Sequence, residues 1–383
     1  MPELVALDLD GGAPFVEALT EVWERGDAVA VLDRRLPPPA AAELMATLRP
    51  TAVIDAAGER RIEGGQGVEA GDALVMATSG SSGRRKAAIL THRALAASAQ
   101  ATSVAAGVDP SRHTWLACLP LAHIGGLSVI TRALLTATPL VVLPGFDASV
   151  VEAHGRRGKA THVSLVPTAL GRLEAGVFTK IVLGGAAPPS DLPANVMTTY
   201  GMTETGSGVV YDGVPIAGVQ IGFGSGEEGG GAIGEILVQS PTLLRAYRDG
   251  TDPTIGGPDR KGRWMATGDA GHLEGGGRLV VDGRLAEVVV TGAEKVWPNA
   301  VEAVLLAHPK VAEIAVWKRP DPEWGERVVA WVVPADRSDP PTLGELAGLA
   351  GESLARWSAP KELVLVDVLP RTASGKVRRT ALG

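Results

Sequence analysis

The sequence has few of the features that would take a protein out of the ordinary globular class. Its 383 residues include one cysteine, Cys118, so neither an intrachain disulfide nor a multi-cysteine zinc site can form. No basic segment followed by an apolar one opens the chain, and Arg, Pro or Gly interrupts every apolar stretch within about 18 residues. We therefore expect a cytoplasmic protein without a secretion signal or a membrane-inserted helix.

A long basic run is also absent, and the formal net charge is -7. The short basic clusters at residues 84–86 and 376–379 are too small for nucleic acid or for an anionic membrane, but they suit a small polyanion such as a nucleoside triphosphate. Cys118 lies in the apolar segment Trp-Leu-Ala-Cys-Leu-Pro, which indicates a buried structural thiol rather than a nucleophile.

Apolar runs rich in Val, Ile and Leu alternate with segments that suit helices, which predicts an α/β fold with a mostly parallel sheet. The predicted strands include residues 28–32, 73–77, 140–143, 162–166 and 180–183, and the predicted helices include residues 39–48 and 93–106. From about residue 217, short alternating segments among many glycines predict a β-rich subdomain. Residues 284–383 predict a small α+β domain, so we expect an N-terminal domain over residues 1–283 and a C-terminal domain over residues 284–383.

The first chemical motif is a loop rich in glycine and hydroxyl side chains, which follows a predicted strand and precedes a predicted helix that starts near His92. It contains Thr78, Ser79, Gly80, Ser81, Ser82 and Gly83 and ends at Lys86. Glycine lets backbone amides approach a phosphate, hydroxyls donate hydrogen bonds, and the lysine adds positive charge. The Walker loop has Ser or Thr after Gly-Lys, so we do not expect a P-loop kinase or GTPase. A flexible Ser/Gly linker is the alternative.

A second motif consists of Tyr200, Gly201, Met202, Thr203 and Glu204. With the first motif, it makes the chain resemble the adenylate-forming superfamily, which includes acyl-CoA synthetases, adenylation domains of peptide synthetases and luciferases. An aromatic ring can stack on a purine, the threonine can reach a phosphate oxygen, and the carboxylate can ligate Mg²⁺. A helix N-terminus with a capping Thr and Glu is the alternative. Upstream, Gly184, Gly185 and Ala186 are similar to the family's backbone contact with adenine, although a simple strand-to-helix turn would look the same.

Three further motifs follow in the family's order. Asp269 in Thr-Gly-Asp resembles the carboxylate that accepts both ribose hydroxyls, and Arg284 resembles an arginine that faces ribose and phosphate; a solvated turn arginine is the alternative. Gly292 and Lys295 belong to a loop similar to the one that packs on the pantetheine arm of coenzyme A. Lys376 resembles the catalytic lysine that bridges the acid carboxylate and the α-phosphate, with a disordered basic tail as the alternative.

This resemblance covers essentially the whole chain, with departures at Arg85, Ala87, Ala286 and Ala293. It implies a large multi-layer N-terminal domain with mostly parallel sheets and a β-rich subdomain, plus a small mobile α+β C-terminal domain. It also implies Thr203, Glu204 and Lys376 as catalytic residues, Glu204 as the Mg²⁺ ligand, and ATP, Mg²⁺ and coenzyme A as cofactors and co-substrate. The partners would be these small molecules and a carboxylic acid, with no nucleic acid, and the sequence leaves formation of a homo-oligomer open.

Several segments resemble one subgroup, the o-succinylbenzoate–CoA ligases of menaquinone biosynthesis, among them residues 165–168, 184–188 and 199–212. The candidate contacts with the acid are His123, Gly125, Arg132, Thr168 and Gly206. Arg132 is the only charge in a long apolar stretch, and a buried guanidinium needs an anionic partner. o-Succinylbenzoate has two carboxylates, so the arginine could bind the one that does not react. The alternatives are a core arginine that snorkels or pairs with a structural carboxylate, and a core role for His123.

Two other functions remain open at this point. One is a different acyl- or aryl-CoA ligase, or a free-standing adenylation domain that loads a carrier protein. The other is a catalytically silent nucleotide-binding protein, which the presence of Lys86, Glu204, Asp269 and Lys376 disfavours.

Overall fold

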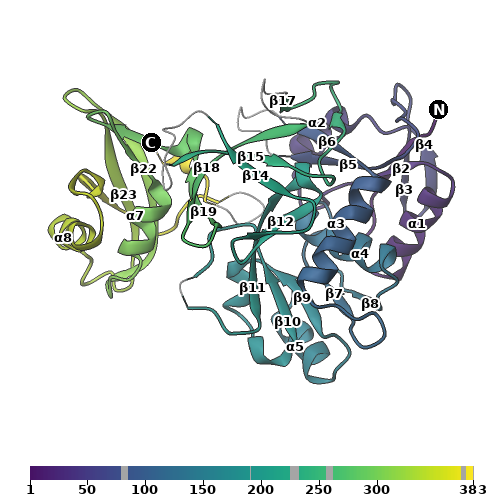
Figure 1. The fold of residues 1–383 in the computed structure, drawn as a ribbon, viewed down its shortest axis with the longest axis horizontal. Helices are drawn as coiled ribbons and strands as arrows, with labels where there is room; N and C mark the ends of the chain where they lie inside the picture. Colours follow the sequence, from purple (N-terminus) through teal and green to yellow (C-terminus); the bar gives the residue numbers. More distant parts are fainter. Residues whose placement is uncertain (79–84, 190, 225–232, 256–261, 372–376, 383) are drawn as a thin grey trace. The chain divides into compact units, whose positions relative to one another are not determined.

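The computed structural model describes residues 1–383 except 79–84, 190, 225–232, 256–261, 372–376 and 383 (Figure 1). The chain forms two compact units. The first consists of Met1–Gly222, Leu237–Ala266 and Gly275–Leu279, and the second of Phe223–Ile236, Thr267–Glu274 and Val280–Gly383. Because the chain passes between the units more than once, no single cut separates them, and the predicted boundary between residues 283 and 284 stays a prediction.

The first sheet of the first unit has seven strands in the order β16-β6-β5-β2-β1-β3-β4. Their bounds are β1 (Leu4–Leu7), β2 (Ala28–Val31), β3 (Ala52–Asp55), β4 (Gly58–Arg61), β5 (Asp72–Thr78), β6 (Lys86–Thr91) and β16 (Ala246–Tyr247). The helices α1 (Ala13–Glu24) and α2 (Pro38–Leu48) connect β1, β2 and β3, which pair in parallel. Leu44 and Leu48 of α2 share a core with Val53, Val75 and Ile89, because one apolar face of each element must be covered.

A second seven-stranded sheet has the order β13-β12-β11-β10-β9-β7-β8. The five strands from β11 to β8 in this order pair in parallel. Its strands are β7 (Trp115–Ala117), β8 (Leu140–Val142), β9 (His162–Leu165), β10 (Lys180–Leu183), β11 (Val196–Met202), β12 (Ser207–Tyr211) and β13 (Val214–Pro215). The helices between them are α4 (Ile124–Leu135), α5 (Ala148–Arg156) and α6 (Pro167–Leu170). Cys118, just after β7, is buried in the core of this sheet, and burial raises the pKa of its thiol to about 12.

Helix α3 (His92–Ala105) follows β6 directly, and Figure 1 shows it beside α4. The helix begins here because the hydroxyl of Thr91 accepts a hydrogen bond from the backbone N–H of Ala94 at 3.2 Å, which satisfies one of the free donors of the first turn. The predicted helix is therefore confirmed, but strand β6 lies between it and the glycine-rich loop. Lys86 is thus the first residue of a strand and not part of a helix N-terminus.

A third sheet follows the order β14-β15-β18-β17, with β19 on β18. It consists of β14 (Gln220–Phe223), β15 (Gly234–Gln239), β17 (Thr254–Ile255), β18 (Trp264–Glu274) and β19 (Arg278–Arg284). These strands agree with the predicted β-rich region, and three glycines at residues 275–277 form the turn between β18 and β19.

The last hundred residues form a small α+β layer whose sheet has the order β21-β20-β23-β22, with β24 beside β23. Its elements are β20 (Val289–Thr291), β21 (Glu294–Val296), α7 (Pro298–Leu305), β22 (Val311–Asp321), β23 (Gly325–Pro334), α8 (Leu343–Ser353) and β24 (Glu362–Leu365). Val301 and Leu346 from the two helices pack on Val316 and Val328 of the sheet. Thr342 and Glu345 cap α8 reciprocally, which satisfies two of the free donors of its first turn.

The predicted fold class is confirmed: several mixed sheets are layered with helices, followed by a small α+β domain. Among the described residues, the helices are too short or too polar to span a membrane.

Candidate active site

The hairpin that holds the glycine-rich loop is formed by β5 and β6. Thr78, the last residue of β5, pairs with Lys86, the first residue of β6. The two strands therefore hold Thr78 and Lys86 at the same edge of the sheet, at the two ends of the loop. The predicted phosphate contacts at Ser79, Gly80, Ser81, Ser82 and Gly83 lie outside the described residues and stay predictions.

The segment from Tyr200 to Glu204 leaves β11 and enters a 3-10 turn (Thr203–Thr205). The hydroxyl of Thr205 accepts a hydrogen bond from the backbone N–H of Met202 at 3.0 Å, which closes the turn. Strand β12 follows the turn, so the alternative reading of this segment as a helix N-terminus is wrong. Position 201 has room only for glycine, because a Cβ there would lie 2.2 Å from the carbonyl oxygen of Ser207.

Tyr247, at the end of β16, joins these two motifs. Its hydroxyl donates a hydrogen bond to Oε1 of Glu204 at 3.0 Å, and the ammonium of Lys86 lies 4.7 Å from the centre of its ring. The backbone N–H of Leu244 also donates to the carbonyl of Glu204 at 2.7 Å. Sequence reasoning missed this tyrosine, because its position beside Lys86 follows from the pairing of β16 with β6.

The Glu204 carboxylate has the chemistry of a magnesium ligand. Within the described part of the chain, no three His, Cys, Asp or Glu side chains gather as a metal cluster. A single carboxylate nevertheless suits Mg²⁺, which keeps several waters and is completed by nucleotide phosphates. Among the described residues, the carboxylate accepts a hydrogen bond from Tyr247 through Oε1, so its other oxygen remains available to a cation.

The glycines after β10 form the predicted adenine segment. Gly185 has a φ of 84°, a conformation that favours glycine. A Cβ on Gly184 would lie 2.7 Å from a methyl carbon of Thr199, so this turn approaches β11 just before Tyr200. Gly184 and Ala186 follow β10, and Tyr200 lies on the neighbouring strand β11. This arrangement is compatible with one nucleotide site.

Asp269 and Arg284 form an ion pair in the second unit. The carboxylate of Asp269 is 5% exposed and lies 2.7 Å from Nε of Arg284, which is about half exposed. Arg284, the last residue of β19, is therefore paired with a buried carboxylate of β18, although about half of its side chain is exposed to solvent. The pair offers an acceptor and a cation side by side, which suits a ribose and its phosphate.

The β20–β21 hairpin carries the predicted pantetheine loop. Gly292 has a φ of 58°, and Ala293 has a φ of 70° at the position where the family has a second glycine, a conformation that costs about 1 kcal/mol or more for alanine. A Cβ on Gly292 would lie 2.6 Å from the ring of Trp324. Lys295 follows in β21 and is exposed. Lys376 lies outside the described residues.

Arg132 is buried in α4 without a carboxylate partner. Its side chain is 2% exposed, and its Nη2 donates to the hydroxyl of Ser207 at 3.1 Å. The guanidinium lies 4.7 Å from the ring centre of Trp115, while Nη1 has no hydrogen-bond acceptor. Among the described residues no carboxylate forms an ion pair with it, and burial lowers its pKa. Neither a snorkelling arginine nor one paired with a structural carboxylate fits these contacts.

The Thr199 hydroxyl on β11 is a second buried group that has no hydrogen-bond partner among the described residues. It would lie 1.9 Å from a Cβ at Gly208 of β12. Unpaired buried polar groups are costly and rare. Nη1 of Arg132 and the Thr199 hydroxyl are thus two buried donors that have no acceptor among the described residues.

The remaining predicted substrate residues lie at the start of α4, on α6 and at the end of the 3-10 turn. His123 precedes α4 and is 45% exposed in its side chain, so the core role is wrong for it. Its Nε2 accepts a hydrogen bond from Arg35 at 3.1 Å. Gly125 lies two helical turns before Arg132, and Thr168 lies on α6. Gly206 ends the 3-10 turn with a φ of 69°.

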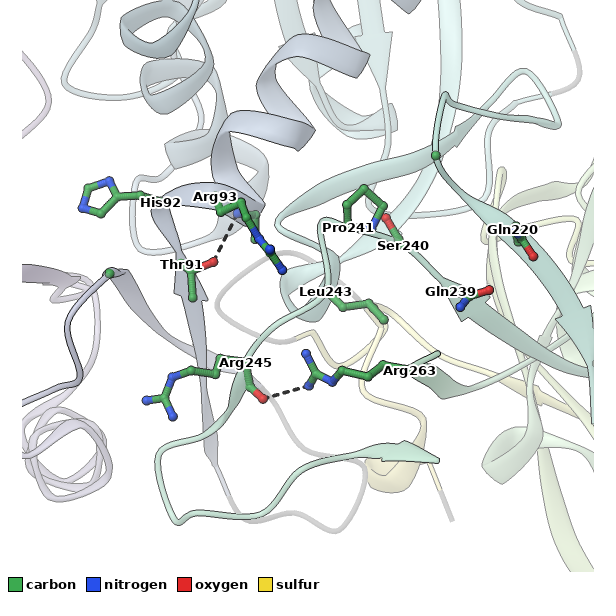
Figure 2. A pocket seen from close by; sticks show the side chains of 13 residues that line it. Thr91, His92, Arg93, Gln220, Gln239, Ser240, Pro241, Leu243, Arg245 and Arg263 are labelled. Atoms are coloured by element: carbon green, nitrogen blue, oxygen red, sulfur yellow. Dashed lines mark hydrogen bonds between the residues drawn. The ribbon is translucent and has the colours of Figure 1, made fainter. Parts of the chain in front are cut away.

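A cavity of about 870 Å³ opens at the other end of β6 (Figure 2), five residues and roughly 17 Å from Lys86. It is lined mainly by residues at the start of α3 and by the segment around β15, among them Thr91, Arg93, Gln220, Gln239, Arg245 and Arg263. Arg245 is engaged by Asp72 at 2.8 Å and Arg263 by Asp252 at 3.1 Å. The predicted site residues do not line this cavity.

Comparison with known proteins agrees with this geometry. Residues 65–248 match the AMP-binding enzyme model, and residues 300–376 match the AMP-binding enzyme C-terminal domain. A probable 2-succinylbenzoate–CoA ligase of Mycobacterium tuberculosis is 38% identical over 83% of this chain and 85% of its own. An indoleacetate–CoA ligase of Aromatoleum aromaticum is 36% identical over 80% of this chain and 66% of its own.

Solved structures show the same similarity. The o-succinylbenzoate CoA synthetase of Bacillus subtilis in complex with its acyl-adenylate intermediate has a TM-score of 0.86 at 27% identity, covering 99% of this chain and 88% of that one. The same enzyme with ATP and a magnesium ion has a TM-score of 0.85 at 26% identity, with coverage of 99% and 89%. With both family models in consecutive order and a relative matched over most of its length, the chain belongs to the AMP-binding enzyme family.

Proposed function

We propose that the protein is an ATP-dependent acid–CoA ligase that converts o-succinylbenzoate to o-succinylbenzoyl-CoA in menaquinone biosynthesis. The family membership supports the adenylation chemistry. The relatives and structures named for this substrate support the identity of the acid. The observation that carries the choice of acid is the buried guanidinium of Arg132, which has no carboxylate partner of its own among the described residues.

A dicarboxylate fits this arrangement better than a monocarboxylate does. The chain carboxylate of o-succinylbenzoate is less hindered than the ring carboxylate, so we expect it to react. The ring carboxylate would then accept hydrogen bonds from Arg132, whose Nη1 lacks an acceptor. A charge-assisted hydrogen bond of this kind is worth about 1.5–3 kcal/mol. Ser207, already bonded to Nη2, would orient the guanidinium toward the acid.

In the proposed first step, the acid carboxylate attacks the α-phosphorus of ATP and pyrophosphate leaves. Lys86 would bind the phosphates, and Lys376 would offset the charge that builds as the two anions meet. Glu204 would hold Mg²⁺, which supplies positive charge to the triphosphate when bound. Asp269 and Arg284 would hold the ribose through an acceptor and a cation that are already paired at 2.7 Å.

In the proposed second step, the thiol of coenzyme A attacks the acyl-adenylate carbonyl, AMP leaves, and a thioester forms. The hairpin around Gly292 and Lys295 would contact the pantetheine arm, since glycine leaves backbone open to a narrow ligand. The mobility of the C-terminal domain, which the family resemblance implies, stays a prediction.

An acid screen tests the proposal. The purified protein would be assayed for CoA-dependent AMP formation with o-succinylbenzoate, indole-3-acetate, benzoate and a set of amino acids. The highest kcat/KM is expected with o-succinylbenzoate. A higher value with another acid would assign a different ligase, AMP formation without CoA transfer would indicate a free-standing adenylation domain, and inactivity with every acid would support a silent nucleotide-binding protein.

A further inference from the structure

Tyr247 occupies the position between the two charged residues of the nucleotide site. It pairs with Ala88 across β16 and β6. Side chains two residues apart lie on the same face of a strand, so Lys86 and Ala88 face the same way. The ring of Tyr247 therefore lies diagonally opposite Lys86, and the ammonium lies 4.7 Å from the ring centre.

The other side of the same tyrosine engages Glu204. The phenol hydroxyl donates to Oε1 of Glu204 at 3.0 Å, and the backbone N–H of Leu244 holds the carbonyl of Glu204 at 2.7 Å. The segment before and including β16 thus fixes both the main chain and the side chain of the glutamate. The hydroxyl can be this donor because a tyrosine in its ordinary, neutral form has a phenol O–H.

Lys86 and Glu204 contact the same tyrosine, one at its ring and the other at its hydroxyl, but they do not form an ion pair with each other. Within the described part of the chain, neither has an oppositely charged group within 4.0 Å. A direct ion pair would occupy the ammonium that a phosphate needs and the carboxylate that Mg²⁺ needs. A ring face attracts a cation, and a phenol O–H satisfies one carboxylate oxygen. One neutral side chain therefore holds both charged groups in place and leaves the ammonium available to a phosphate and the carboxylate available to Mg²⁺.

We propose that Tyr247 is a positioning residue for magnesium–ATP: it holds Lys86 and Glu204 apart and aims each at its own part of the triphosphate complex. This inference rests on the proposed function, since it takes Lys86 as a phosphate contact and Glu204 as the Mg²⁺ ligand. Tyr247 itself does not contact the reacting atoms in this account.

Two variants separate the two contacts. Tyr247→Phe keeps the ring beneath Lys86 and removes the hydrogen bond to Glu204, whereas Tyr247→Leu removes both. ATP binding would be measured by calorimetry over a Mg²⁺ titration, without any acid. Tyr247→Phe should raise the Mg²⁺ concentration for half-maximal binding about fivefold while changing ATP affinity at saturating Mg²⁺ less than about twofold. Tyr247→Leu should also weaken ATP binding at saturating Mg²⁺ by about fivefold.

A matched control is Tyr211→Phe, which removes a buried hydroxyl that bonds to Thr102 at 3.0 Å. Its Mg²⁺ requirement should equal that of the wild type. The positioning role is overturned if both Tyr247 variants keep the wild-type Mg²⁺ requirement, or if they lower only the melting temperature.

The same titration distinguishes this inference from the proposed function. Wild-type protein that binds magnesium–ATP but activates no acid would refute the ligase proposal, while the variants would still report on Tyr247. Wild-type protein that activates o-succinylbenzoate, together with Tyr247→Phe and Tyr247→Leu variants of unchanged Mg²⁺ requirement, would refute the role of Tyr247 alone.

Discussion

Replacing Arg132 with methionine should separate recognition of the acid from stability of the fold. Methionine has a similar volume and no charge, so it fills most of the buried space while removing the N–H donors of the guanidinium. If Arg132 binds the ring carboxylate, the loss of a charge-assisted hydrogen bond costs about 1.5–3 kcal/mol in the transition state. This corresponds to a decrease of about tenfold to a hundredfold in kcat/KM for o-succinylbenzoate.

The stability of the free protein should respond differently. The wild type keeps Nη1 of Arg132 buried without an acceptor, a cost of about 1–3 kcal/mol that the variant removes. The variant loses the hydrogen bond to Ser207 and the contact with the Trp115 ring, together worth about 1–3 kcal/mol. The two changes nearly cancel, so the free energy of unfolding should stay within about 1 kcal/mol of the wild type.

The assay compares two acids with both proteins. o-Succinylbenzoate has the ring carboxylate, and 4-oxo-4-phenylbutanoate lacks it but keeps the reacting chain. Arg132→Met should lower kcat/KM for the first acid and leave it nearly unchanged for the second, with the KM for ATP unaltered. An equal loss for both acids, or a loss of several kcal/mol in stability, would refute the reasoning and make Arg132 a structural residue.

Two further predictions concern Lys376, the predicted catalytic lysine, and a buried histidine. Lys376→Ala should abolish acid-dependent ATP–pyrophosphate exchange but leave ATP affinity within about twofold, because the lysine acts on charge that develops during the reaction; unchanged exchange would rule out its catalytic role. His162 is 1% exposed, and burial lowers its pKa to about 4. The folded state favours the neutral imidazole. The contribution of His162 to the free energy of unfolding is therefore complete above about pH 6.5, and roughly 2–3 kcal/mol of it is lost as the pH falls toward 4. Urea unfolding of His162→Gln should show a weaker decrease of stability over this range than the wild type, and parallel curves would contradict the assignment.

The local patterns in the sequence predicted much of the fold. The strands at residues 162–166 and 180–183 and the helix at residues 93–106 are present within one residue at each end, because apolar runs bounded by turn residues have few other ways to be buried. Strand β6 was missed because its short stretch, Lys-Ala-Ala-Ile-Leu-Thr, lies directly against a helix and has no turn residues to mark its end.

The site was predictable where a motif carries its own chemistry. Lys86, Glu204 and Asp269 each belong to a short motif that can be recognised in the sequence, and the isolated charge of Arg132 pointed to an unusual environment. Tyr247 carries no such signal, since its contacts join residues from three distant segments through strand pairing. The lack of a carboxylate partner for Arg132 was also not predictable. It depends on which side chains among the described residues the fold brings near the guanidinium.

The central claim is the identity of the reaction, and product analysis tests it most directly. Wild-type protein would be incubated with o-succinylbenzoate, ATP, Mg²⁺ and coenzyme A, and the products separated and identified by mass spectrometry. The account predicts equal amounts of AMP and o-succinylbenzoyl-CoA, with neither product accumulating when the acid is omitted. Failure to form this thioester, while another acid yields its own CoA thioester with AMP, would contradict it.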